Sequence, residues 1–421
     1  MALQNPNALN AKKDGLGEII QVVKEAKSVN EKIKILQAND SRELRGIFEL
    51  AYDNRLKWAL PEGTPPYKPL DKSFDNQGML HTEMRRMYIF LEGKANMPQA
   101  RREQSFVQLL EQLKAWEDDD SIGAVVVKSN SEKAFCAGGD IRQLYQNKEQ
   151  GAHQDPPFFA TEYALNRLIF HYSKPYIALM DGITMGGGLG ISMHGSHRIA
   201  TERLQWAMPE SKIGFFTDVG ASYHLSRLPE MVGYYLALSG RTIDAATAQD
   251  LNLVDATVPS SNLAELEAAL YALDLAHNAD EMISEAISSF IKPMEENALA
   301  EYYPKIRRCF SMNSIEGIFQ ALELEADDWS DALLGELRQR SPTSLKVIFN
   351  QLNRAIHLSF DELISQDLVV AMHFLQGQVL FEGVRALLIE KDLTPHWNPV
   401  SLIKVQESDV VEYFNPQSAS V

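Results

Sequence analysis

Cysteine is nearly missing from this 421-residue sequence, which contains only Cys136 and Cys309. The two lie far apart without metal-ligand spacing, so the sequence predicts neither a zinc site nor a disulfide framework, and a reducing compartment fits. The chain also lacks an uncharged apolar run long enough to span a bilayer, and its first residues lack the apolar core of a signal peptide. We therefore expect a cytoplasmic protein with no membrane partner.

Positive charge is also scarce, because the sequence contains 40 Lys and Arg but 57 Asp and Glu, which gives a net charge of -17. This balance argues against general binding of nucleic acid or of a membrane surface, although a local basic patch could still receive an anionic ligand. Two catalytic signatures are missing as well, the G-x-S-x-G elbow of serine hydrolases and the H-E-x-x-H motif of zinc enzymes. A serine thioesterase and a metal site are therefore disfavoured.

The hydrophobic pattern divides the chain into three parts, and its length suggests two or three packed units. The first part has helical periodicity, with helices expected at 15–28, 42–53, 79–92 and 101–113. Proline-rich residues 61–69 predict an extended loop, which is either a rigid connector or a recognition segment.

The second part alternates between strand and helix. The apolar runs at 123–127 and 176–180 are typical of buried strands, and an amphipathic helix is expected between them at 158–171. This alternation continues to Val258 and predicts βαβ-type units of an α/β fold. After Pro259 the pattern is helical and punctuated by proline, so we expect a helical C-terminal region.

Two glycine-rich segments lie where predicted strands lead into helices. The first is K-A-F-C-A-G-G-D-I-R at 133–142, and the second is G-I-T-M-G-G-G-L-G at 182–190. Glycine lets the main chain approach a ligand and leaves N–H groups pointing outward at a helix start. Two such turns can aim two N–H groups at one thioester oxygen, as in an oxyanion hole, unless each is only a structural turn. The G-x-G-x-x-G spacing of a dinucleotide loop is not met.

Two carboxylates follow in the apolar segment A-M-P-E-S-K-I-G-F-F-T-D-V-G at 207–220. Glu210 and Asp218 stand eight positions apart, with Gly214 between them. Apolar surroundings raise the pKa of a carboxyl group and make it a competent base near neutral pH. The alternatives are a solvated loop residue for Glu210 and a helix N-cap for Asp218.

Together these motifs resemble those of the crotonase (enoyl-CoA hydratase/isomerase) superfamily, and their residues are most similar to those of its 3-hydroxyisobutyryl-CoA hydrolase branch. The resemblance continues through S-P-T-S-L-K at 341–346 and F-E-G-V-R-A at 381–386, and it covers about residues 112–405. It implies a crotonase-like ββα spiral core at 112–260, followed by a helical C-terminal region at 261–421.

The resemblance also implies roles for individual residues. The N–H groups of Gly139 and Gly187 would bind the thioester oxygen, Glu210 would be the catalytic glutamate, and Asp218 would contact the acyl hydroxyl or the water. Substrate binding falls on the two glycine turns, at Lys133, Ala137, Gly138, Asp140 and Gly186. The expected partner is an acyl-CoA, and no separate cofactor is expected because CoA is part of the substrate. The C-terminal helices would either fold back over their own site or serve a neighbouring subunit, so an oligomer stays open.

Gly190 bears on the choice of reaction. Hydratases of the family carry a second carboxylate at the matching position, and glycine cannot transfer a proton. With a single glutamate beside the carbonyl, we predict hydrolysis of a short 3-hydroxyacyl-CoA, namely 3-hydroxyisobutyryl-CoA, the family's substrate in valine catabolism. Water would attack with Glu210 as general base, or Glu210 would form a mixed anhydride. Enoyl-CoA hydratase or isomerase activity is the alternative.

The start of the chain departs from the family. The family's first β-hairpin is absent, and residues 1–111 instead resemble an uncharacterised protein of large tailed phages, through L-P-E-G at 60–63, P-P-Y-K-P at 65–69 and F-V-Q-L-L-E at 106–111. We therefore expect a separate, mostly helical N-terminal module of unknown function and a core with an exposed strand edge. A second hypothesis is a non-catalytic fusion in which the truncated crotonase part is inert.

Overall fold

The computed structural model describes residues 99–139, 141–149, 156–292 and 296–417. Contacts divide the chain into two units, Met1–Phe90 with Asp119–Ile122 and Leu91–Asp118 with Gly123–Val421, and the described residues lie almost entirely in the second. The helices expected at 15–28, 42–53 and 79–92, the loop at 61–69 and Asp140 lie outside the described residues.

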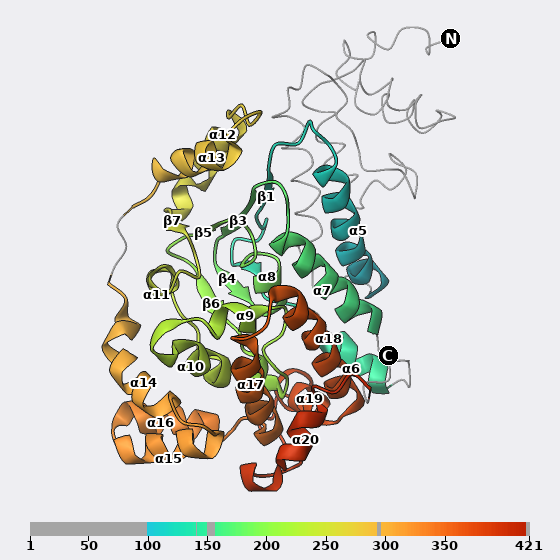
Figure 1. The fold of residues 1–421 in the computed structure, drawn as a ribbon, viewed down its shortest axis with the longest axis vertical. Helices are drawn as coiled ribbons and strands as arrows, with labels where there is room; N and C mark the ends of the chain where they lie inside the picture. The colour runs from blue at the N-terminus through green and yellow to red at the C-terminus, as the bar shows by residue number, and fades with distance from the viewer. Residues whose placement is uncertain (1–98, 140, 150–155, 293–295, 418–421) are drawn as a thin grey trace. The chain divides into compact units, whose positions relative to one another are not determined.

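Short parallel strands form two sheets, and the chain alternates between them. One sheet has the order β1-β3-β5-β7 and the other has the order β2-β4-β6. Each of the first three strands of the larger sheet is followed by a strand of the smaller sheet, which is the expected ββα arrangement (Figure 1). The strands are β1 Val125–Val127, β2 Ala134–Cys136, β3 Tyr176–Met180, β4 Ile183–Met185, β5 His197–Ala200, β6 Gln205–Ala207 and β7 Ala256–Thr257.

The larger sheet forms the centre of the core. Every residue of β1 and β3 is buried, as expected for parallel strands that are covered on both faces. In register, Val126 lies opposite Ile177, which in turn lies opposite His197 of β5. Within the part of the chain that the structure describes, β1 pairs only with β3, so one edge of this strand has no strand partner there.

Helices α5, Gln99–Glu117, and α7, Pro156–Phe170, pack against each other beside the sheets (Figure 1). Buried Leu109, Leu113 and Trp116 anchor α5, and the Tyr172 hydroxyl donates a hydrogen bond to its Leu113 carbonyl over 2.7 Å. These two helices correspond to those predicted at 101–113 and 158–171. Because α5 continues through residue 111, the predicted boundary between module and core falls inside a helix.

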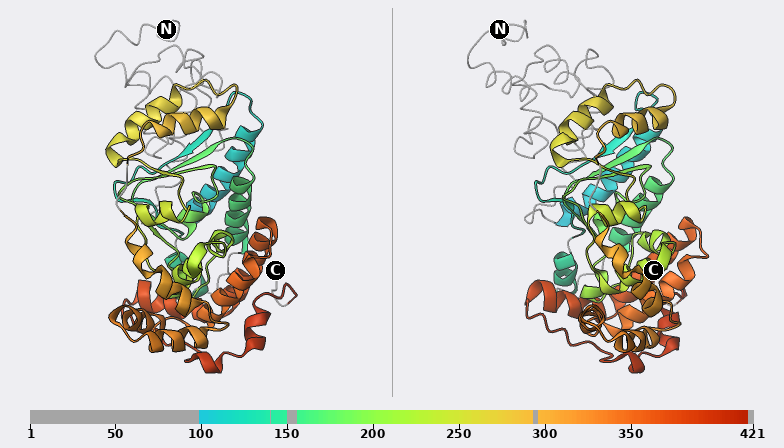
Figure 2. Two further views of the ribbon diagram at one scale, coloured as in Figure 1. Left: turned by 60° about the vertical axis from the view of Figure 1, so that its left-hand side comes forward. Right: turned by 90° about the vertical axis from the view of Figure 1, so that its left-hand side faces the viewer.

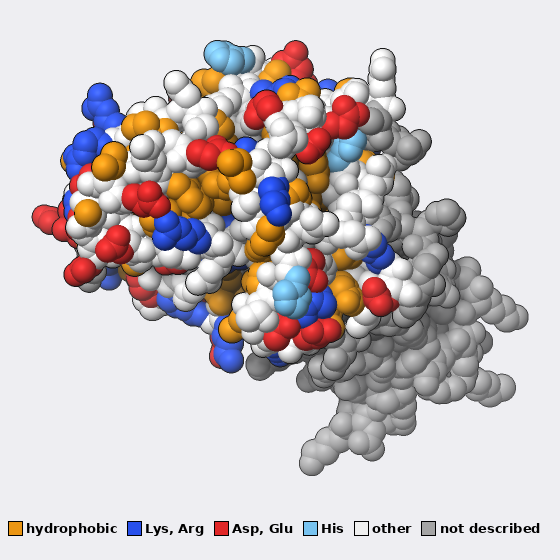
Figure 3. Space-filling view, turned by 90° about the horizontal axis from the view of Figure 1, so that it is seen from below, with side chains coloured by type: hydrophobic (Ala, Val, Ile, Leu, Met, Phe, Trp, Pro, Cys, Tyr) orange, Lys and Arg blue, Asp and Glu red, His pale blue; other side chains and the backbone are white. Residues whose placement is uncertain are grey.

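The C-terminal region is helical, as predicted, and no strand follows Pro259 among the described residues. Two views show α12 and α13 at one end of the sheets and α14 to α20 at the other (Figures 1 and 2). On the latter end, apolar side chains lie interspersed with acidic and basic ones (Figure 3). The helices are α12 Leu263–Tyr271, α13 Ala279–Ser288, α14 Tyr303–Phe310, α15 Ile315–Glu325, α16 Asp328–Leu337, α17 Pro342–Ala355, α18 Phe360–Gln376, α19 Val379–Val384 and α20 Glu407–Glu412.

Between the strands and this region lie shorter helices, namely α6 Ile141–Glu149, α8 Gly187–Gly190, the 3-10 helix η3 Glu210–Ile213, α9 Ala221–Leu225, α10 Val232–Ser239 and α11 Ala245–Asp250. Helices α6, α8 and η3 begin shortly after β2, β4 and β6, so all three sequence motifs lead into helices after strands of the smaller sheet.

Candidate active site

The three sequence motifs meet at one edge of the smaller sheet. Residues 137–139 follow β2, Gly186 follows β4, and Glu210 follows β6 by a short segment. Because the carboxyl ends of neighbouring parallel strands lie at the same edge, these segments are brought together, where open parallel sheets commonly bind ligands. The prediction that the first glycine segment directly follows the strand at 125–127 is wrong, because this segment itself contains β2.

The two glycine turns contact each other. A Cβ built on Gly187 would lie 3.6 Å from Gly138 Cα and 3.7 Å from Gly139 N, and one built on Gly138 would lie 3.5 Å from Gly187 N. Gly138 has a φ of 95°, which favours glycine. The N–H groups of Gly139 and Gly187 have no hydrogen-bond partner among the described residues. Two unpaired donors therefore lie near each other, as an oxyanion hole requires.

Two carboxylates pack against the second glycine turn. A Cβ on Gly186 would lie 2.8 Å from Glu210 Oε1, and a Cβ on Gly187 would lie 2.5 Å from Glu162 Oε1. Both distances are shorter than real Cβ contacts, so a side chain at either position would displace the carboxylate beside it. The absence of side chains lets both carboxylates approach the main chain of the turn.

Glu210 is buried rather than solvated, which excludes the loop alternative. Its Oε2 has no hydrogen-bond partner among the described residues. Burial raises the pKa of this carboxyl well above its ordinary value, and the negative charge of Asp218 adds to the effect. The raised pKa makes the Glu210 carboxylate a stronger base than a solvated glutamate, as general-base catalysis requires.

Asp218 is also buried, and its Oδ2 accepts a hydrogen bond of 2.8 Å from the Tyr163 hydroxyl. Burial raises the pKa of Asp218 to about 7, although the Tyr163 hydrogen bond acts in the opposite direction. The N-cap alternative is wrong, because Gly220 occupies that position of α9 and no side chain caps the helix. The Asp218 side chain is thus free of a capping role.

Glu162 of α7 is a third buried carboxyl that the sequence analysis missed. Its pKa is raised well above the ordinary value by burial and by the charge of Asp218. The prediction of a single glutamate beside the carbonyl is therefore wrong. A signal was present, since Phe159, Glu162, Tyr163 and Asn166 share a helical spacing that places three polar side chains on one buried face.

The remaining predicted site residues lie in the first glycine turn or just before it. Lys133, Ala137, Gly138 and Gly139 are exposed, whereas Asp140 lies outside the described residues. Cys136 stands between Lys133 and Ala137 in the sequence. Burial raises the pKa of its thiol to about 11, so this cysteine stays protonated and is a poor nucleophile at neutral pH.

The C-terminal helices fold back over the site of their own chain. A Cβ on Gly383 of α19 would lie 2.1 Å from the Ile213 carbonyl oxygen, so α19 packs directly on η3, which begins with Glu210. The Trp397 ring packs on Gly214 in the same way, with Cζ3 2.8 Å from a Cβ built there. These contacts fix the helix that carries Glu210.

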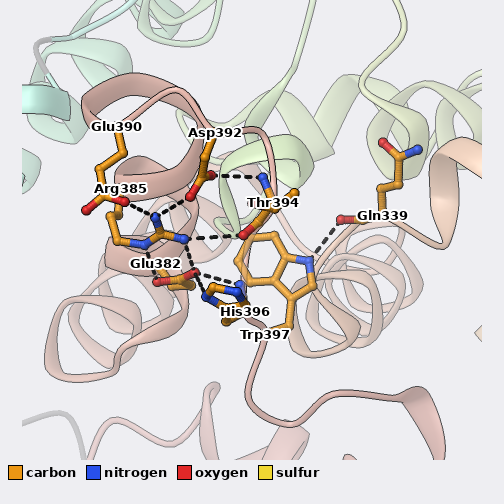
Figure 4. A network of polar contacts seen from close by, with 8 residues as sticks. All are labelled: Gln339, Glu382, Arg385, Glu390, Asp392, Thr394, His396 and Trp397. Atoms are coloured by element: carbon orange, nitrogen blue, oxygen red, sulfur yellow. Dashed lines mark hydrogen bonds and ion pairs between the residues drawn. The ribbon is translucent and has the colours of Figure 1, made fainter.

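Arg385 holds the segment that leads to Trp397 (Figure 4). Its guanidinium donates to Glu382 over 2.7 and 2.9 Å, to Asp392 over 2.7 Å, and also to Glu390. Glu382 in turn accepts from the His396 N–H over 2.6 Å, and Trp397 Nε1 donates to the Gln339 carbonyl over 2.9 Å. This network supports the active site from the C-terminal side.

No group of three or more His, Cys, Asp or Glu in the described ranges is arranged to hold a metal ion. None of the helices described is long and apolar enough to cross a membrane.

A family model described as Enoyl-CoA hydratase/isomerase matches residues 100–414. A second model, of a family of unknown function (DUF6433), matches residues 19–130, and the two matches overlap over α5.

Sequence relatives include the mitochondrial 3-hydroxyisobutyryl-CoA hydrolases of Gallus gallus and Xenopus tropicalis. The Gallus protein is 37% identical over 314 residues, which cover 73% of this chain and 81% of the relative. The Xenopus protein is 39% identical over 306 residues, which cover 72% of this chain and 80% of the relative.

Similar solved structures include a carnitinyl-CoA dehydratase from Mycobacterium thermoresistibile, with a TM-score of 0.70 and 33% identity over 76% of this chain and 92% of that one. An enoyl-CoA hydratase from Rhodobacter sphaeroides 2.4.1 has a TM-score of 0.68 and 29% identity over 75% and 90% of the two chains.

Proposed function

The chain belongs to the enoyl-CoA hydratase/isomerase family, and from this premise we propose that it hydrolyses a short 3-hydroxyacyl-CoA thioester, with 3-hydroxyisobutyryl-CoA as its substrate. The observation that carries the proposal is the identity of 37–39% to hydrolases of that name over about four fifths of their length. The arrangement of Glu210, Asp218 and the two glycine turns supports it, because thioester hydrolysis needs a base and a paired oxyanion donor.

The proposed reaction begins when the thioester oxygen accepts hydrogen bonds from the N–H groups of Gly139 and Gly187. Glu210 takes a proton from water, the water oxygen bonds to the carbonyl carbon, and negative charge on the thioester oxygen is stabilised by the two donors. When the tetrahedral intermediate collapses, the carbon–sulfur bond breaks and the CoA thiolate receives the proton from Glu210. Alternatively, the Glu210 carboxylate attacks the carbonyl carbon, the carbon–sulfur bond breaks and CoA leaves as the thiolate, and water then hydrolyses the mixed anhydride to release the acid and restore Glu210.

Substrate binding follows the geometry of the turns. The exposed residues Lys133, Ala137 and Gly138 would meet the CoA part, while the acyl group would face the buried carboxyls. The family resemblance adds Gly186 and Asp140 to the binding residues. Asp218, whose pKa is about 7, would hydrogen-bond the 3-hydroxyl group or the attacking water. The compartment stays a prediction, as do the absence of other cofactors and the oligomeric state.

Hydration of an enoyl-CoA is the second candidate, and Glu162 is the observation that favours it. A hydratase needs two carboxyls near the double bond, and Glu162 provides a second one beside Gly187 although Gly190 provides none. The two candidates differ in their products, because only hydrolysis releases a free thiol.

To test the proposal, the full chain is incubated with 3-hydroxyisobutyryl-CoA and with an enoyl-CoA. Thiol release reports hydrolysis, and loss of the conjugated double bond reports hydration. We expect thiol release from the hydroxyacyl ester, lowered about 10²- to 10⁴-fold by Glu210→Gln with CoA-ester binding retained. Glu265→Gln, which alters an exposed glutamate of α12, is the matched control. Hydration without thiol release would favour the hydratase, and no reaction with either ester would favour the inert fusion.

A further inference from the structure

The loop that carries Asp218 has an unfavourable main-chain conformation. Val219 has a φ of 53° and Gly220 a φ of 73°, both in the left-handed region. A β-branched residue rarely adopts this conformation, and it persists only where the surrounding structure enforces it. The strain therefore lies directly beside the Asp218 carboxyl.

Three buried side chains from distant parts of the chain hold this loop by its main chain. Gln351 Nε2 of α17 donates to the Thr217 carbonyl over 2.8 Å, and Asp367 of α18 accepts from the Gly220 N–H over 2.9 Å. His194 Nε2 lies 2.7 Å from the Val219 carbonyl and must donate to it. We name Gln351, Asp367 and His194 the Asp218 brace.

The members of the Asp218 brace are also connected to one another and to a further residue. Gln351 Nε2 donates to Asp367 Oδ1 over 2.9 Å. Because His194 Nε2 is the donor to Val219, its Nδ1 is the acceptor for the His224 ring nitrogen 3.2 Å away. The brace thus fixes the main chain on both sides of Asp218.

We propose that the Asp218 brace positions the Asp218 carboxyl for the reaction, so that α17 and α18 are part of the catalytic apparatus. The brace touches the carbonyl before Asp218 and the two polar main-chain groups after it, whereas the side chain itself accepts one hydrogen bond, from Tyr163. Asp367 is fully buried, and its two carboxyl oxygens accept hydrogen bonds from the Gly220 N–H and from Gln351, so burial of this polar group is compensated by the contacts that hold the loop.

The first test is Gln351→Met in the full chain, which keeps the side-chain size and removes both donated hydrogen bonds. This inference rests on the proposed function, so thiol release from 3-hydroxyisobutyryl-CoA is the assay. We expect kcat to fall about 10- to 100-fold with little change in KM, because a small displacement of a reacting group has effects of this size. Gln366→Met is the matched control, since Gln366 lies next to Asp367 and its Nε2 has no hydrogen-bond partner among the described residues.

The second test compares His194→Gln with His194→Leu. The glutamine amide can still donate to the Val219 carbonyl, whereas leucine cannot, although both changes remove the imidazole ring. We expect Gln to keep kcat near that of the unaltered chain and Leu to lower it. A role in packing alone would give both variants the same kcat and would lower only the melting temperature.

The outcomes separate this inference from the proposed function. If the unaltered chain releases no thiol, the proposed function fails. Crystal structures of the unaltered chain and of Gln351→Met then test the brace separately, because the brace requires that the variant lose the Tyr163–Asp218 hydrogen bond. An active chain whose kcat is unchanged by Gln351→Met, or a variant structure that keeps this hydrogen bond, would overturn the brace.

Discussion

Tyr163 donates its hydroxyl proton to Asp218 Oδ2 over 2.8 Å, and this is the hydrogen bond that connects α7 to the catalytic loop. The contact favours the ionised carboxylate, whereas burial disfavours it, and the charge of Asp218 in turn raises the pKa values of Glu162 and Glu210. The direction of each effect on the pH profile can therefore be predicted.

Tyr163→Phe removes this hydrogen bond and keeps the ring. Loss of a donor raises the pKa of Asp218 further above 7, so the acidic limb of the kcat/KM profile should move to higher pH. The measurement is thiol release between about pH 5 and 9. Tyr234→Phe is the control, because it removes a hydroxyl that bonds Asn353 instead, and it should leave the limb in place. Equal profiles for the two variants would contradict this assignment.

Glu162→Gln should move the same limb in the opposite direction. The charge of Glu162 contributes to the raised pKa of Glu210, so its neutral replacement lowers that pKa and extends activity to lower pH. The assay is the same pH profile, with Glu265→Gln as the control on an exposed site. An unchanged limb would mean that Glu162 is not charged beside Glu210 and would contradict this prediction.

The glycines and two of the carboxyls were predictable because their signals are local. Gly138, Gly186 and Gly187 stand in turns after apolar strands; Gly138 has a positive φ that favours glycine, and a carboxylate oxygen lies close to the place of a side chain at Gly186 and Gly187. Glu210 and Asp218 belong to one short apolar segment. The alternation of strands and helices likewise identified the α/β core.

Other residues of the site could not be predicted because they depend on long-range packing. Helical spacing groups Glu162 with Tyr163 and Asn166 on one face, but the contact of Glu162 with the second glycine turn depends on how α7 packs against the sheets. Gln351 and Asp367 lie in helices that ordinary periodicity identifies, yet their contacts with the Asp218 loop depend on how the C-terminal region folds back. The division into two sheets was also hidden, since β2 lies inside a segment that reads as a glycine turn.

Asp218→Asn should stabilise the fold at the expense of activity. The pKa of Asp218 is raised from its ordinary value of 3.8 to about 7, so the folded protein holds this proton more tightly than the unfolded chain. Its contribution to the free energy of unfolding is complete below pH 3.8 and is lost as the pH rises through about 7. We expect the gain from Asn to be about 2–3 kcal/mol larger at pH 8 than at pH 5.

Thermal or urea unfolding at the two pH values measures this difference, and Asp327→Asn is its control. Lys305 lowers the pKa of Asp327 to about 2, so its stabilisation is present above pH 3.8 and is lost only as the pH falls towards 2. The Asp327 variant should therefore lose the same stability at pH 5 and pH 8. A gain for Asp218→Asn that does not depend on pH would show that the fold does not raise the pKa of this carboxyl.

Gly190 is the position where a hydratase of the family would carry its second carboxylate, and the structure leaves no room for one. A Cβ there would lie 2.7 Å from Asn166 Nδ2 and 2.9 Å from Val219 Cβ. Gly190→Ala should therefore lower the free energy of unfolding by about 1–3 kcal/mol, as overpacking does. It should also lower kcat, because the displaced Val219 adjoins Asp218.

Gly335→Ala is the matched control for this change. Gly335 lies in α16 with nothing within 4 Å of an added Cβ, so alanine there should raise the free energy of unfolding by about 0.5–1 kcal/mol. Urea unfolding and thiol release of both variants give the comparison. Gly190→Glu should then produce no enoyl-CoA hydration, because a glutamate at this position must displace Asn166 or the strained loop before it can reach the substrate. Hydration by the Gly190→Glu variant would mean that the loop at Val219 moves at little cost in free energy. The fixed conformation of this loop would then not be what distinguishes a hydrolase from a hydratase.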